Sequence, residues 1–186
     1  IKLLSVASKK LSKIEQRVHP CFVKLKSDIA KVSNEINAVV VNDSVIGKNI
    51  FEGPGAGAGP TGASVMSDLM DIIRGTYNYP LGVSIKKKKK LKIQKIDDLL
   101  FPYYLRITAK DKAGVMAKIS KALSKRKISI ESIIQKPSKR SNFAEIILIT
   151  HTVKESSLLS SIKQIKRLPE VSSSVKFIRI EDSLWP

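Results

Sequence analysis

Hydrophobic and polar residues follow two different periods in the C-terminal half of the chain. Residues 114–126 and 155–167 carry apolar side chains at helical spacing, three or four positions apart. Four runs between and around them are rich in β-branched and aromatic residues, as β-strands are. These runs are residues 103–109, 128–135, 143–152 and 175–180. The order βαββαβ predicts an α+β fold of the ferredoxin-like kind, an antiparallel four-stranded sheet with two helices on one face.

The N-terminal half predicts more strands and a hairpin. Residues 1–7 and 18–25 have strand composition, and a polar segment separates them. Residues 28–34 predict a short helical turn. Residues 37–51 then predict a β-hairpin, because two β-branched runs flank the polar turn residues 42–44.

A glycine- and proline-rich segment, residues 53–61, follows the hairpin and predicts a loop without regular structure. An amphipathic helix is expected directly after it, with Pro60 and Thr61 in its first turn and Gly75 at its end. Its apolar stripe predicts packing on one side. The stripe consists of Val65, Leu69, Ile72 and Ile73, widened by Met66 and Met70.

Charge changes this picture only in part. The chain has 34 Lys and Arg against 16 Asp and Glu, a net charge of +18, which raises nucleic-acid binding as a lesser alternative. The lysines are spread along the chain without interleaved aromatics, so a solvated basic surface is the better interpretation. Lys86–Lys90, five consecutive lysines, predict an extended connector over residues 78–101 that can also contact anionic partners.

Few residues suggest chemistry of their own. Cys21 is the single cysteine, which excludes an intrachain disulfide and fits a reducing cytoplasm. His19 and His151 are the two histidines and have no ligand-spaced partners, so no metal site is predicted. No apolar run reaches the roughly 18–20 residues of a membrane span, so no membrane partner is expected.

Two blocks of sequence resemble homoserine dehydrogenases that end in an ACT domain, a small ligand-sensing module. The first block runs from Asn37-Ala38-Val39 through Gly53-Pro54-Gly55-Ala56-Gly57 and Thr61 to Asp68-Leu69. The second comprises Tyr103–Ile107, Asp111–Val115, Ile128–Ile130 and Ile149–His151. The resemblance implies three parts: residues 1–77 from the catalytic and dimerisation domain, the lysine-rich linker 78–101, and an ACT domain over 102–183.

The family resemblance implies an oxidoreductase that interconverts L-aspartate 4-semialdehyde and L-homoserine with NAD or NADP, in threonine, methionine and isoleucine biosynthesis. The family's nucleotide-binding domain, catalytic lysine and substrate-binding carboxylates are expected upstream of Ile1. No catalytic residue is therefore assigned here, and the chain alone is expected to be inactive. A homodimer or a higher homo-oligomer is expected.

The family resemblance assigns Gly53, Gly55 and Gly57 to the catalytic cleft, beside the nicotinamide of the cofactor. Glycine lets a ligand approach the backbone closely, and a helix N-terminus offers free N–H groups. The alternative is a tight loop that needs glycine only for its positive φ angles. The formal GxGxxG match at residues 57–62 is not a dinucleotide fingerprint, because its preceding strand belongs to a hairpin.

In the ACT turn, the resemblance assigns Asp111, Ala113, Gly114 and Val115 to an amino-acid effector, with threonine expected as the pathway's end product. A bound amino acid can place its carboxylate on backbone N–H groups at the start of the following helix, and its ammonium near Asp111. The alternative is a non-catalytic module that senses amino acids or only dimerises. Ala113 stands where the family usually has proline.

Overall fold

The computed structural model describes residues 1–10, 12–76, 91–138 and 142–181 of the chain. Contacts between residues divide it into two compact units. The sheet unit comprises residues 1–24 and 91–186, and the hairpin unit comprises residues 25–90. This division places the first two strands with the C-terminal fold. The predicted domain boundaries at residues 77 and 101 stay a prediction.

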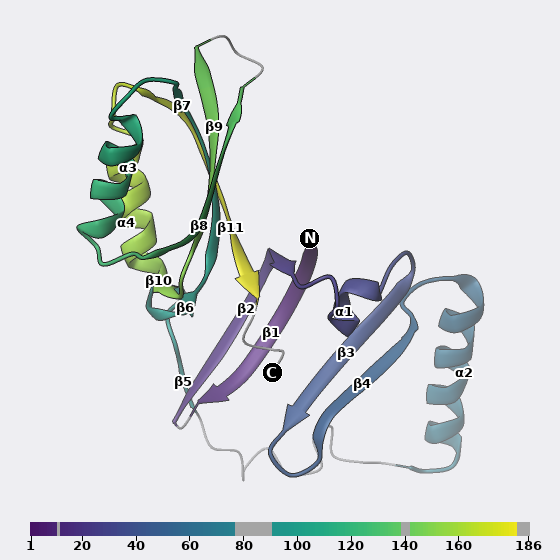
Figure 1. Cartoon of the computed structure of the whole chain (residues 1–186). Coiled ribbons are helices and arrows are strands. Elements are labelled where there is room, and N and C mark those ends of the chain that lie inside the picture. The colour runs from purple at the N-terminus through teal and green to yellow at the C-terminus, as the bar shows by residue number, and fades with distance from the viewer. Residues whose placement is uncertain (11, 77–90, 139–141, 182–186) are drawn as a thin grey trace. The chain divides into compact units, whose positions relative to one another are not determined.

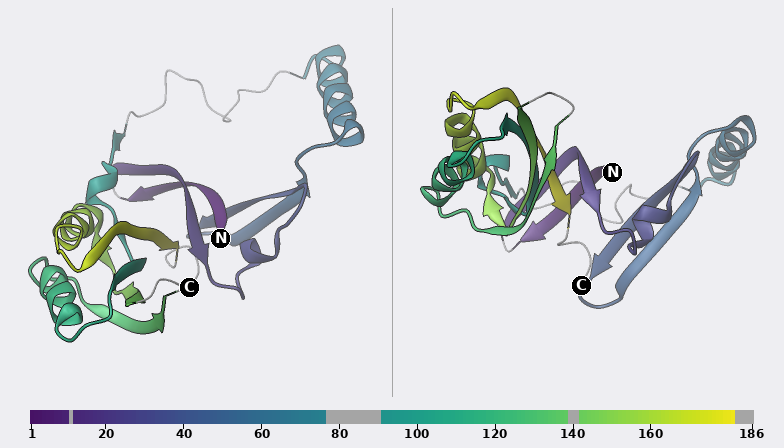
Figure 2. Two further views of the ribbon diagram at one scale, coloured as in Figure 1. Left: turned by 90° about the horizontal axis from the view of Figure 1, so that it is seen from above. Right: turned by 45° about the horizontal axis from the view of Figure 1, so that its top comes forward.

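The C-terminal half of the sheet unit confirms the predicted order βαββαβ. Its strands form an antiparallel sheet in the order β11-β7-β9-β8. Helices α3 and α4 lie side by side on one face of that sheet (Figures 1 and 2). The elements are β7 (Tyr103–Lys110), α3 (Val115–Ser124), β8 (Ile130–Pro137), β9 (Phe143–Thr150), α4 (Glu155–Ile165) and β11 (Val171–Glu181).

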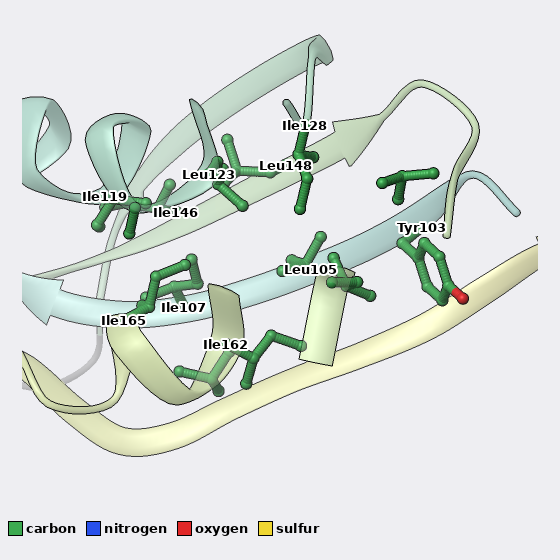
Figure 3. Close-up of a cluster of buried hydrophobic side chains, with 14 of the residues drawn as sticks. Tyr103, Leu105, Ile107, Ile119, Leu123, Ile128, Ile146, Leu148, Ile162 and Ile165 are labelled. Atoms are coloured by element: carbon green, nitrogen blue, oxygen red, sulfur yellow. The ribbon is translucent and has the colours of Figure 1, made fainter. Parts of the chain in front are cut away.

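The core of the sheet unit lies between the sheet and these two helices. In β7, Tyr103, Leu105 and Ile107 are fully buried while the residues between them face outward, the two-residue period of a half-covered strand. Leu123 of α3 and Ile165 of α4 point into the same space (Figure 3). Burying a Leu or Ile side chain stabilises a fold by roughly 1.5–3 kcal/mol, so this layer is the main source of stability.

A second hairpin, β1 (Lys2–Lys10) and β2 (Lys13–Val23), extends the same sheet beyond β11. Within the polar segment expected to separate these two strands, residues 8–10 and 13–17 belong to the strands, so that prediction is wrong. β2 runs parallel to β11, with Cys21 opposite Arg179. Residues more than 150 positions apart thus pair in one β-ladder. No local pattern in the sequence predicts this pairing.

The predicted connector is wrong in its last part, because residues 91–101 form short elements. β5 runs parallel to β2, and its Lys92 lies opposite Lys13 of β2. β6 pairs with β10. The Lys86–Lys90 run lies outside the described residues. The elements are β5 (Lys92–Ile93), the 3₁₀ turn η2 (Ile96–Asp98), β6 (Leu100–Phe101) and β10 (Val153–Lys154).

The hairpin unit contains the predicted hairpin with its turn moved along the chain. Its connection is residues 44–46, because the Asp43 carboxylate accepts hydrogen bonds from the N–H of Val45 at 2.7 Å and of Ile46 at 3.3 Å. Gly47 closes the turn with a φ of 70°, a conformation that favours glycine. The elements are α1 (Asp28–Lys31), β3 (Ile36–Asp43), β4 (Gly47–Pro54) and α2 (Ala58–Ile73).

Helix α2 carries the predicted apolar stripe but begins two residues before Pro60. Leu69 is 47% exposed and Ile73 is 76% exposed, and no residue of α2 is buried within the described chain. The prediction that this helix packs on one side is therefore wrong for the described residues. None of the described helices is long and apolar enough to cross a membrane.

Candidate functional site

The turn that follows β7 leads directly into α3. Gly114 precedes the helix with a φ of +83°, in the left-handed region that a residue with a Cβ adopts at a cost. Within the turn, the Lys112 N–H donates to the Lys110 carbonyl at 3.0 Å and the Val115 N–H donates to the Lys112 carbonyl at 3.3 Å. The first bond inside α3 runs from the Lys118 N–H to the Gly114 carbonyl at 3.2 Å. The backbone of the turn is thus fixed by its own hydrogen bonds.

A pocket of about 270 Å³ opens at this turn. All four residues predicted for the effector line it, so the structure brings that set together in one place. Five further residues line the pocket and were not predicted. The complete lining is Lys110, Asp111, Lys112, Ala113, Gly114, Val115, Met116, Gln135 and Ile146.

The pocket combines charged, polar and apolar groups. The Gln135 side-chain amide donates to the Asp111 carboxylate, with Nε2 and Oδ1 3.1 Å apart, which fixes the carboxylate beside the turn. Val115 is buried and forms part of the apolar lining. The N–H groups of Met116 and Ala117 precede the first bond inside α3, and a helix start of this kind attracts carboxylates. The arrangement suits a small zwitterion.

Gln135 reaches the pocket through strand register. It lies on β8 opposite Ile146 of β9, and Ile146 lies opposite Ile107 of β7. The three strands therefore place Ile107, Ile146 and Gln135, which are 11 to 39 positions apart in sequence, side by side in the sheet. The sequence contains the polar residue but gives no signal that this register selects it.

In the hairpin unit, the three predicted glycines differ in their surroundings. Gly57 is the residue before α2 and has a φ of +118°, so its backbone conformation requires glycine, and its carbonyl accepts the Thr61 N–H at 3.1 Å. At Gly55, an added Cβ would lie 2.0 Å from Nδ2 of Asn37, so that side chain would have to move. At Gly53, an added Cβ would meet no atom within 4 Å among the described residues.

The loop prediction is corrected in extent. Gly53 and Pro54 belong to β4, and α2 begins at Ala58, so the irregular segment is only residues 55–57. A hydrogen bond from the Gly55 N–H to the Glu35 carbonyl, at 2.7 Å, holds the loop against the start of the hairpin. Gly53 therefore lies in the last part of β4, Gly55 is the first residue of the loop, and Gly57 is its last residue, directly before α2.

An antiparallel βαββαβ sheet with a pocket at its first βα turn is the architecture expected of an ACT domain. The family model for the ACT domain matches residues 103–170. This match covers the sheet unit from β7 to Glu170, the residue before β11, and includes the pocket turn.

The chain belongs to the homoserine dehydrogenase family and corresponds to its C-terminal region. The family model "Homoserine dehydrogenase" matches residues 1–70. The homoserine dehydrogenase of Helicobacter pylori is 36% identical over 98% of this chain, and that of Pseudomonas aeruginosa is 38% identical over 97%. The chain spans 43% of the length of each of these relatives.

A solved structure supports the same assignment. The crystal structure of a homoserine dehydrogenase from Thiobacillus denitrificans is 32% identical and matches 97% of this chain with a TM-score of 0.85, over 42% of its own length. The Staphylococcus aureus homoserine dehydrogenase is 21% identical with a TM-score of 0.55, and this likeness speaks for the fold alone.

Proposed function

We propose that this chain is part of an enzyme that interconverts L-aspartate 4-semialdehyde and L-homoserine with NAD or NADP, and that its ACT domain binds threonine as feedback effector. The observation that supports the effector role best is the pocket in which Asp111, Ala113, Gly114 and Val115 meet. The proposal places the enzyme in the cytoplasm, in accord with a single cysteine that is buried and free.

Gly53 is the strongest candidate for contact with the nicotinamide. Gly57 needs glycine for its φ angle, and Gly55 lies against Asn37, so the hairpin unit itself accounts for both. The described chain gives no such reason at Gly53, where a Cβ would enter open space. A glycine without a local steric reason fits a place where a ligand approaches the backbone. When bound, the cofactor supplies the hydride, and the loop's part is to shape the approach to it.

The cofactor contact can be tested on an enzyme in which this chain is joined to its nucleotide-binding domain. Gly53→Ala is expected to raise KM for NAD(P)H while leaving the thermal midpoint unchanged, since the added methyl group meets no protein atom. Gly59→Ala is the matched control, because its Cβ also enters open space but lies within the first turn of α2. Equal KM values in both variants and the parent would remove Gly53 from the cofactor site.

Threonine matches the groups of the effector pocket. Its ammonium would lie at Asp111, and its carboxylate at the N–H groups of Met116 and Ala117. Its hydroxyl would accept or donate a hydrogen bond at Gln135, and its methyl group would contact Ile146. Each of these four threonine groups is thus matched to a different protein group, either in the lining of the pocket or at the start of α3 beside it.

Isothermal titration of the 186-residue chain tests the effector proposal directly. Saturable heat is expected with L-threonine, and little or none with L-aspartate, L-lysine or L-isoleucine. Asp111→Asn should abolish the heat, because the ammonium loses its charged partner. Asp98→Asn is the matched control, since Asp98 is an exposed carboxylate that pairs with Lys154 on another part of the unit. Heat with none of the four amino acids would end the effector proposal.

A second candidate function, a dimerising module, has its own observation. β8 pairs with β9 on one side and ends the described sheet on the other, and Ile133 and Ile134 on it are 47% and 51% exposed. A free apolar edge strand is a surface on which a second copy can extend the sheet. Sedimentation equilibrium should give a homo-oligomer that Ile134→Lys weakens. A monomeric parent chain would exclude this candidate.

A further inference from the structure

A buried ion-pair network joins the hairpin β1–β2 to the rest of the sheet unit. The Arg17 guanidinium of β2 donates to the Glu181 carboxylate at the end of β11, with Nη2 and Oε2 2.7 Å apart. Its Nε lies 2.9 Å from Oε1 of Glu15. The side chains of Arg17 and Glu181 are 2% and 0% exposed. The ring of Phe101 lies 4.8 Å from the guanidinium carbon. A buried ion pair is stable only while both partners keep their geometry, because losing one partner leaves an uncompensated buried charge.

A second buried pair lies beside the first. The Glu155 carboxylate accepts the Tyr103 hydroxyl at 2.6 Å and the Arg179 Nε at 2.8 Å. Burial and the neighbouring Glu155 raise the pKa of Tyr103 well above its usual value, so the hydroxyl keeps its proton and stays a donor. Arg179 also faces the ring of Phe101, with its guanidinium carbon 5.8 Å from the ring centre. The two ion-pair groups thus share one aromatic ring and both include a residue of β11.

The other end of β11 lies beside the effector pocket. The carbonyl of Glu170, the residue before β11, accepts the N–H of pocket residue Lys110 at 2.8 Å. Val171 then pairs with Ala109, and the register shifts before Val175 pairs with Ile107. The strand therefore carries extra residues next to the pocket, where a small movement can be absorbed or passed on.

We propose that β11 couples ligand binding in the amino-acid pocket to the stability of strand β2. The Arg17–Glu181 ion pair is the contact between the two strands on which this coupling depends. The proposal rests on the effector role proposed above. β2 ends at Val23, and the hairpin unit with its glycine loop begins at Leu25. A change in the stability of the β2–β11 pairing therefore acts on the segment that enters the hairpin unit. A ligand in the pocket holds Lys110 more firmly against the Glu170 carbonyl at the start of β11, which stabilises the pairing of β11 with β2.

Hydrogen exchange of the 186-residue chain with and without saturating L-threonine tests this mechanism. The backbone amides of residues 17–19 and 21–23 should exchange at least about fivefold more slowly with threonine, the lower end of the range of allosteric coupling. In Glu181→Gln the threonine titration should still saturate, but the slowing in β2 should disappear. Asp98→Asn should keep both the binding and the slowing, because its ion pair with Lys154 is exposed and lies outside the network.

The possible results separate this inference from the effector proposal. If threonine binds and the amides of β2 do not change, the coupling is refuted and the effector site stands. If no amino acid binds, both fall together. If Glu181→Gln does not fold, Arg17→Lys decides, because it keeps the positive charge of the pair but loses the guanidinium group that bonds the Glu181 carboxylate. A response in β2 that persists in the variant used would show that the ion-pair network is structural only.

Discussion

The two units carry similar hydrophobic patterns and reach different degrees of burial. In the sheet unit, Leu123 of α3 is 0% exposed, because the sheet and α4 cover its face of the helix. In the hairpin unit, Leu69 stands in a comparable stripe on α2 and is 47% exposed. The hairpin strands show the same contrast, since Val39 and Phe51 are 60% and 64% exposed.

The contrast shows that hydrophobic periodicity reports the shape of an element and not whether a second layer covers it. A stripe at helical spacing forms a helix in both units. Coverage depends on what the rest of the chain brings to that face. Two experiments compare the units directly, and two with smaller expected effects then test a backbone conformation in the hairpin unit and a buried histidine in the sheet unit.

The first experiment compares a buried with an exposed ion pair. Glu155→Ala removes the carboxylate that faces Arg179 and Tyr103 in the sheet unit, leaving a buried charge without its partner. We expect a loss of about 3–5 kcal/mol in the free energy of unfolding, measured by urea denaturation. Asp28→Ala removes the exposed pair with Lys48 in the hairpin unit and should leave the urea midpoint unchanged. Similar losses in both would contradict the contrast.

The second experiment compares two leucines on helices. Leu123→Ala opens a cavity in the packed layer and should cost about 2–5 kcal/mol of unfolding free energy. Leu69→Ala changes a partly exposed side chain and should stay within about 0.5 kcal/mol of the parent. Far-ultraviolet circular dichroism against urea measures both. A large cost at Leu69 would mean that the stripe on α2 is covered in solution.

The third experiment compares two glycines next to and within α2. Gly57→Ala places a Cβ at a φ of +118°, and we expect a loss of about 1–3 kcal/mol. Gly62→Ala lies inside the helix with open space around its Cβ and should stabilise it by about 0.5–1 kcal/mol. Hydrogen exchange of the α2 amides reports each change locally. The two changes in stability are expected to have opposite signs. A change of the same sign in both variants would contradict the backbone conformation assigned to Gly57.

The fourth experiment concerns pH and the join between β2 and β11. Burial, with smaller contributions from Arg179 and Arg17, lowers the pKa of His19 below 6.5. The unfolded chain then binds the proton more tightly than the folded chain, so this contribution to stability is complete above pH 6.5 and is lost as the pH falls from there through the lowered pKa. His19→Phe should flatten that part of the curve of thermal midpoint against pH. His151→Phe, at an exposed position, is the control.

Local sequence signals predicted much of the fold and part of the candidate site. The βαββαβ order followed from alternation and helical spacing, and the residues of the effector turn followed from the family resemblance. The alternative interpretation, that the loop needs glycine for its φ angles, agrees with the φ of +118° at Gly57. The hairpin turn was placed too early, because Val45 and Ile46 have strand composition but sit in a connection fixed by the Asp43 carboxylate. Binding at either candidate site stays a prediction.

By itself, the sequence determined the longer helices and strands and their order, since side-chain branching, apolar spacing and glycine act over a few neighbouring residues. Only the tertiary structure decided which elements meet. It placed β2 beside β11, so that Arg17 and Glu181 form a buried pair 164 positions apart. It also selected Gln135 for the pocket through the register of β8 and β9. The pairing of strands so far apart in sequence depends on the packing of the whole sheet, so a local sequence pattern does not predict it.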